Sequence, residues 1–282
     1  MVNRIDSQSS GTKGSYKQSL KALLPYGMLA TKKWLIGQGL STHAIDNAVK
    51  TETLLSLATG VYSQYSRSVS WEGVVASIQR MGKHEGKAEP SVIVGGLSAL
   101  SLSGLSQYLP LGSKPHIHLY AAGKLPTWLG RLKLPIEFEG HSTVKLWPDS
   151  LLKNKTYIKE HHWSGELSPV YYSCPEKAVL ELLVKLPNTV TFEHADELMQ
   201  GMVNLSPRKL DALLQACKSI KVKRLFLWLA KRQNYHWFSK LNVKDYDLGS
   251  GKRLIAKDGK LDKDYLITVP LEMVEKDDKV QG

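Results

Sequence analysis

The chain has 282 residues, 42% of them hydrophobic, a combination that predicts two globular domains and excludes disorder over most of its length. Its formal net charge of +12 favours a polyanionic partner, with nucleic acid as the first candidate. Its two cysteines, Cys174 and Cys217, form no CxxC motif, and no segment resembles a signal peptide or a membrane span. We therefore expect a cytoplasmic protein without disulfides or membrane contact.

The N-terminal part predicts a flexible segment over residues 1–14 and a winged helix-turn-helix domain over residues 15–82. A first helix begins near Ser15 and ends at Pro25-Tyr26-Gly27, because proline and glycine disfavour helix continuation. A second helix begins at Thr31, whose hydroxyl can accept a bond from a free backbone N–H. It ends at Gly37-Gln38-Gly39, which predicts the tight turn of a helix-turn-helix.

Ser41 can cap a third helix with two distinct faces. The apolar face holds Ala44, Ile45, Ala48 and Val49. The polar face holds Thr42, His43, Asp46, Asn47 and Lys50. Short polar groups of this kind suit base edges in a major groove, where Asn47 can bond adenine bidentately. Asp46 has two open roles, since it can accept a bond from cytosine or discourage non-cognate DNA.

Residues 53–65 predict two short strands joined at Thr59-Gly60, and this hairpin is the candidate wing. Trp71 begins a fourth, amphipathic helix that closes the small core. We predict DNA contacts from helix and wing together. The full set is Lys32, Lys33, Ser41, Thr42, His43, Asp46, Asn47, Lys50, Gln64, Tyr65 and Arg67. The alternative is a winged helix that contacts only proteins and has a solvated basic face.

Residues 83–90 predict a charged, glycine-containing linker, and residues 91–282 a larger mixed α/β domain. Apolar or β-branched runs come first in this domain, at 92–94, 117–120, 134–138, 143–147, 157–161 and 169–173. A short helix over 97–105 interrupts them, and four more helices follow at 175–186, 193–203, 207–219 and 220–233. Beyond Lys257 the charges mix, and we expect a frayed end. The fold class is α+β, with strands first and helices after.

A basic cluster characterises residues 207–233, and six of its members are candidates for toxin contact. They are Arg208, Lys209, Lys218, Lys221, Lys223 and Arg224. Such a density indicates an acidic protein surface or a second nucleic-acid contact. A solvated face on helices that bury their leucines explains it equally well.

Motifs of the common enzyme classes are absent from the sequence: there is no HExxH, GxxxxGK[ST], GxSxG or GxGxxG. His116 and His118 share one face of a predicted strand, and His141 and the pair His161-His162 could join them as metal ligands. Strand spacing does not establish convergence, so hydrogen-bonding or solvent-facing histidines are the preferred interpretation. We therefore expect no enzyme activity, no metal and no cofactor.

Three short sequence segments resemble the AbiEi family, the antitoxins of AbiE-type type IV toxin–antitoxin systems. They are residues 54–62 (LLSLATGVY), residues 95–100 (GGLSAL) with Gly104-Leu105, and residues 175–178 (PEKA). The resemblance implies an autorepressor in abortive infection and phage defence that binds inverted repeats in its own promoter. It also implies a C-terminal domain that counters an AbiEii-like nucleotidyltransferase toxin without a stable complex.

Inverted repeats require two copies on DNA, and we expect a monomer or weak dimer in solution. Two other functions remain open from the residues. One is a ligand-responsive winged-helix regulator whose C-terminal domain senses a metabolite. The other is a nuclease targeted by the winged helix, for which a carboxylate cluster would be needed.

Overall fold

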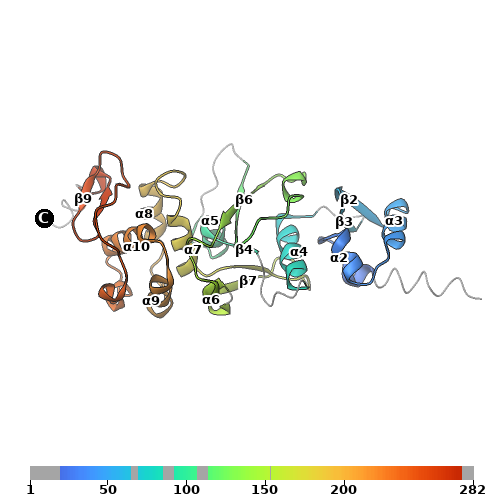
Figure 1. Ribbon diagram of the computed structural model, residues 1–282, viewed down its shortest axis with the longest axis horizontal. Coiled ribbons are helices and arrows are strands. Elements are labelled where there is room, and N and C mark those ends of the chain that lie inside the picture. Colours follow the sequence, from blue (N-terminus) through green and yellow to red (C-terminus); the bar gives the residue numbers. More distant parts are fainter. Residues whose placement is uncertain (1–19, 65–68, 85–91, 107–113, 153, 275–282) are drawn as a thin grey trace, which may run out of the picture. The chain divides into compact units, whose positions relative to one another are not determined.

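A computed structural model describes residues 20–64, 69–84, 92–106, 114–152 and 154–274 (Figure 1). The chain divides into two compact units. The first contains the described residues up to 84 together with two segments from later in the chain, 126–135 and 162–170. The second contains the remaining described residues from 92 onward.

The first unit has the order of a winged helix-turn-helix, as the sequence predicts. Its elements are β1 (Leu29–Thr31), α2 (Lys32–Gly37), α3 (Thr42–Lys50), β2 (Leu54–Ala58), β3 (Val61–Gln64) and α4 (Trp71–His84). The strands form one antiparallel sheet in the order β1-β3-β2. Strand β1 is not expected from the sequence, because three residues are too few to show a period of two. The first predicted helix is described only from Leu20, and its expected start at Ser15 lies outside the described residues.

A glycine contact closes the core of the first unit. A Cβ added to Gly73 of α4 would lie 2.0 Å from the carbonyl oxygen of Gly27 and 3.2 Å from the Trp163 ring. Only glycine lets α4 approach the turn before β1 so closely. Trp163 comes from the later segment 162–170, so this core includes side chains that the N-terminal sequence does not supply.

The second unit is α+β, and its strands lie mainly before its helices, in agreement with the sequence. Its first half contains β4 (Val92–Val94), α5 (Gly96–Leu102), β5 (His116–Ala121), β6 (Glu137–Ser142), α6 (Asp149–Leu152), β7 (Ile158–His161) and β8 (Val170–Ser173). The sheet order is β6-β5-β4-β8-β7. β5 is antiparallel to β4 but parallel to β6, and β4 is parallel to β8.

Helices dominate the second half of this unit. They are α7 (Pro175–Leu183), α8 (Phe192–Gln200), α9 (Pro207–Ala216) and α10 (Ile220–Gln233). α7 is buried from Glu176 to Leu183 and contacts α5, α9 and α10 (Figure 1). Strands β9 (Lys260–Asp262) and β10 (Ile267–Val269) then form an antiparallel pair, so the described residues beyond Lys257 carry structure that the mixed charges did not predict.

Two predicted strands differ from the structure. Residues 143–147 form a turn in which the backbone N–H groups of Leu146 and Trp147 both donate to the Thr143 carbonyl. The predicted strand at 134–138 instead begins at Glu137, because Pro135 has no N–H to donate to a ladder. Single-turn 3₁₀ helices occupy Leu129–Arg131, Lys155–Tyr157, Phe238–Lys240 and Val243–Asp245.

A buried carboxylate ties α7 to α5 and to the turn at residues 143–147. Glu181 is fully buried and accepts hydrogen bonds from the Gly96 N–H and from Trp147 Nε1, at 3.2 and 3.3 Å. The Lys177 ammonium lies 3.2 Å from the same carboxylate and is itself buried. This pairing explains how two charges tolerate the interior, since each would be costly there alone.

Candidate nucleic-acid interface

Helix α3 presents the polar face that the sequence predicts. Ser41 Oγ accepts a hydrogen bond from the Ala44 N–H at 3.1 Å, which satisfies one of the free donors of the first turn. Ile45 and Ala48 are buried. The exposed residues of the capped helix are Ser41, Thr42, His43, Asn47 and Lys50. This side of α3 is therefore accessible to a ligand, with hydroxyl, imidazole, amide and ammonium groups within nine residues.

An ion pair connects α2 to α3. Lys32 Nζ lies 2.6 Å from Asp46 Oδ1, and the hydrogen bond to this carboxylate raises the pKa of Lys32. Asp46 is thus paired with Lys32 of the same domain. This ion pair explains why an acidic residue lies on the polar face of α3. Lys33, the next residue of α2, is exposed. Among the described residues of α2 and α3, the exposed cations are Lys33 and Lys50.

The hairpin forms, but one of its expected DNA contacts is wrong. Gln64 is buried, and its Nε2 donates to the Leu24 carbonyl at 2.5 Å, so it joins β3 to the first helix instead of facing outward. Tyr65 and Arg67 lie outside the described residues. β2, β3 and the turn between them contain no charged residue. The described part of the wing therefore offers hydroxyls such as Ser56 and Thr59, whereas the exposed cations lie on the helices.

The basic residues of α9 and α10 do not form the single exposed face that their density suggests. Arg208 is exposed and Lys209 half-buried. Lys218 and Lys221 donate through Nζ to backbone carbonyls, those of Val144 for the first and of Val184 and Leu186 for the second. These bonds hold the amino end of α10 against preceding turns.

Lys223 and Arg224 correct the sequence prediction most clearly, because both are buried. The Arg224 guanidinium donates to backbone carbonyls of Leu248, Gly249, Gly251 and Leu266. Arginine suits this position because its planar fork carries five donors. The side chain organises the C-terminal loops and is not available to a partner. No local pattern distinguishes it from an exposed arginine, since its acceptors lie 24 to 42 residues later in the chain.

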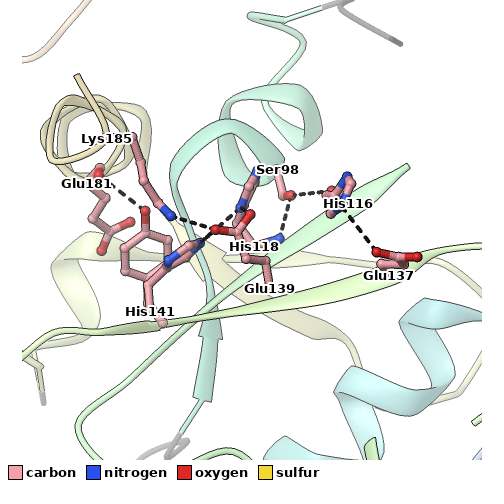
Figure 2. Close-up of polar contacts among 9 residues, drawn as sticks. Ser98, His116, His118, Glu137, Glu139, His141, Glu181 and Lys185 are labelled. Atoms are coloured by element: carbon pink, nitrogen blue, oxygen red, sulfur yellow. Dashed lines mark hydrogen bonds and ion pairs between the residues drawn. The ribbon is translucent and has the colours of Figure 1, made fainter. Parts of the chain in front are cut away.

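The structure brings together a group that sequence reasoning left apart. His118 Nδ1 lies 3.0 Å from His141 Nε2, and Glu139 contacts both rings (Figure 2). Lys185 donates to Glu139 Oε1 at 2.5 Å. His116 pairs separately with Glu137 at 3.4 Å, and neither His161 nor His162 belongs to the group. The strand-face argument placed His116 beside His118 as a possible ligand, but the structure leaves His116 out of the group and adds Glu139 and Lys185, which the sequence reasoning missed.

Burial governs the protonation of this histidine group. Desolvation lowers the pKa of His118 and lowers that of His141 to about 4, so both rings are neutral at pH 7. Desolvation alone would raise the pKa of Glu139, but the hydrogen bond from Lys185 and the charges nearby lower it overall. The group therefore combines two neutral imidazoles with an ionised carboxylate.

A winged helix-turn-helix with an exposed polar face on α3, joined to a larger α+β unit, is the architecture of a two-domain transcriptional regulator. The chain belongs to the AbiEi antitoxin family. The family described as "Transcriptional regulator, AbiEi antitoxin, Type IV TA system" matches residues 114–270, and the AbiEi antitoxin N-terminal domain matches residues 14–111. The resemblance to the AbiEi family that the three short sequence segments indicated is confirmed.

One solved structure similar to this chain is the crystal structure of the RV2827C protein from Mycobacterium tuberculosis. The two are 15% identical, with a TM-score of 0.49 over 96% of this chain and 97% of that chain. A search of the curated proteins gave no match. Among the described residues, no helix combines the length and apolar character that a membrane span requires.

Proposed function

We propose that the chain represses its own promoter by binding inverted repeats through α3, with one copy on each half-site. The observation that carries the proposal is the exposed polar face of α3, where Thr42 and Asn47 can reach base edges in a major groove. Lys33 and Lys50 would contact phosphates beside it, in agreement with the net charge of +12. Two-fold symmetric repeats require two such helices.

Fluorescence anisotropy with the promoter fragment tests this role. We expect N47A to lose about 1–3 kcal/mol of discrimination at one base pair, since that is the contribution of a bidentate base contact. K33A and K50A should weaken binding to every sequence and reduce the salt slope by about 0.9 each. K240A is the matched control, because Lys240 is an exposed lysine in the second unit. Equal affinity for promoter and scrambled DNA would remove the repressor role.

The second unit, we further propose, counters a cognate nucleotidyltransferase-like toxin without catalysing a reaction and without a stable complex. Support comes from family membership and from the basic residues of α9 and α10 that the sequence proposed and that are not buried. These candidates are Arg208, Lys209, Lys218 and Lys221. Arg208 and Lys218 are both exposed, but Lys218 donates to the Val144 carbonyl, so Arg208 makes the better single test.

Co-expression with the adjacent gene in a growth assay tests the antitoxin role. The wild-type chain should restore growth, and so should N47A, because DNA reading and neutralisation belong to different units. R208A/K209A should restore it less. A ligand-responsive regulator predicts a different pattern: no rescue by any variant, together with a promoter affinity that changes with a small molecule. The two hypotheses are therefore separated by the same set of strains.

A further inference from the structure

The parallel register of β5 and β6 places three potential metal ligands on one face of the sheet. His118 lies opposite Glu139, and Tyr120 lies opposite His141. Side chains two residues apart on a strand point to the same side, so the two histidines and the glutamate share a face (Figure 2). Lys185, which follows α7, reaches the same group.

The distances within this group match those of a tetrahedral ion site. Nδ1 of His118 and Nε2 of His141 are 3.0 Å apart. Glu139 Oε2 lies 3.3 Å from His118 Nδ1, and the other oxygen, Oε1, lies 3.7 Å from His141 Nε2. Bonds of about 2.0–2.1 Å at tetrahedral angles separate two ligand atoms by about 3.4 Å. The separation of the two histidine nitrogens and that of His118 Nδ1 from Glu139 Oε2 are therefore within a few tenths of an ångström of those around an ion. One ligand atom from each of the three residues lies within 4.8 Å of the other two.

Lys185 leaves the carboxylate able to serve as a ligand. Its ammonium occupies Oε1 of Glu139, whereas Oε2 is the oxygen nearest to His118. A carboxylate has lone pairs on both oxygens, so one can bind an ion while the other accepts a hydrogen bond. Outer-shell bonds of this kind commonly orient metal ligands. The side chain of Glu139 is 38% exposed, while those of His118 and His141 are 18% and 10% exposed, which leaves a route from solvent.

We propose that His118 Nδ1, His141 Nε2 and Glu139 Oε2 bind a first-row divalent transition-metal ion of the zinc type. A site with two imidazole ligands does not favour Mg²⁺ or Ca²⁺, because these ions prefer oxygen ligands. Three protein ligands leave a fourth tetrahedral position for water or for a group of a partner. The site lies in the second unit and is independent of the DNA-binding role.

The same two strands provide an internal control. His116 and Glu137 form the neighbouring pair on these strands, with His116 Nε2 3.4 Å from Glu137 Oε2. Their side chains are 42% and 58% exposed, and within the described part of the chain they join no group of three ligands. One imidazole and one carboxylate in such an exposed place form an ordinary ion pair. H116A should therefore leave metal binding unchanged, although it removes a histidine two residues from His118.

Equilibrium dialysis of the full chain against Zn²⁺, followed by metal analysis, tests the site. We expect one ion per chain, and Co²⁺ substituted for Zn²⁺ should show the intense visible absorption of a tetrahedral complex. H118A/H141A should lower the affinity by more than about 100-fold, a loss beyond that of an outer-shell change. H116A should bind like the wild type.

E139Q provides a second variant in case the double alanine variant does not fold, as judged by far-ultraviolet circular dichroism. The amide keeps the size of the side chain and can still accept from Lys185, but it is a poor metal ligand, so we expect at least about 10-fold weaker binding. The proposal is overturned if the wild-type chain retains no Zn²⁺. It is equally overturned if E139Q or H118A/H141A retains the ion as firmly as the wild type, because the ion is then bound by other groups.

Discussion

Replacement of Arg224 by methionine should destabilise the second unit, since R224M keeps the aliphatic length but removes every donor. The Arg224 side chain is 1% exposed and supplies hydrogen bonds to four backbone carbonyls. Two of these belong to the exposed residues Gly249 and Gly251, where water can replace the guanidinium. The other two belong to the half-buried residues Leu248 and Leu266. The Leu266 carbonyl keeps the hydrogen bond from the Arg253 N–H at 2.9 Å, whereas the Leu248 carbonyl would lose the guanidinium.

An unsatisfied buried carbonyl costs about 1–3 kcal/mol, so the Leu248 carbonyl predicts a loss of about 1–3 kcal/mol in the free energy of unfolding. Urea denaturation followed by tryptophan fluorescence measures this loss. Hydrogen exchange should show faster opening of residues 253–269, which include the amides that bond across this loop. R208M is the control, because Arg208 is exposed and its replacement should change stability by less than about 0.5 kcal/mol. An R224M chain with wild-type stability and exchange rates would refute the reasoning.

Three further substitutions test separate contacts. D46A should release Lys32 from its ion pair and steepen the salt dependence of DNA binding by about 0.9 in slope, as measured by anisotropy over a range of KCl. K177M should leave the buried Glu181 charge without its cation and lower the free energy of unfolding by about 3–5 kcal/mol in urea denaturation. G73A should destabilise the first unit by about 3 kcal/mol and abolish promoter binding, since its Cβ has no room beside a backbone oxygen.

Matched variants make each of these tests decisive. K32M/D46A should return the salt slope to its wild-type value, and an unchanged slope in D46A itself would contradict the role assigned to the ion pair. K177M/E181Q should recover part of the stability lost in K177M, because it removes the unpaired charge. G37A should be neutral or stabilising by up to about 1 kcal/mol, since a Cβ there meets nothing within 4 Å. Equal effects of G37A and G73A would show that the close approach is unimportant.

Local sequence was sufficient for the recognition helix and its surroundings. Thr31 and Ser41 lie at the N-caps of α2 and α3, where each side chain accepts the bond expected of it. The apolar positions of α3 and α4 repeat at helical spacing, and the glycine of the wing turn has a φ of +71°. These features depend on residues within a few positions of one another, so the chain order alone reveals them.

Tertiary structure decided where the long polar side chains lie. Gln64 and Arg224 are buried because carbonyl groups distant in sequence accept their hydrogen bonds. The residues next to them in the sequence do not indicate which carbonyl groups these are. The group of His118, Glu139 and His141 depends on the pairing of two strands in one particular register. A shift of that register by one residue would turn the ligands of one strand to the opposite face. Periodicity within a strand determines which side chains share a face, whereas only the packed sheet determines which strands are neighbours and in what alignment.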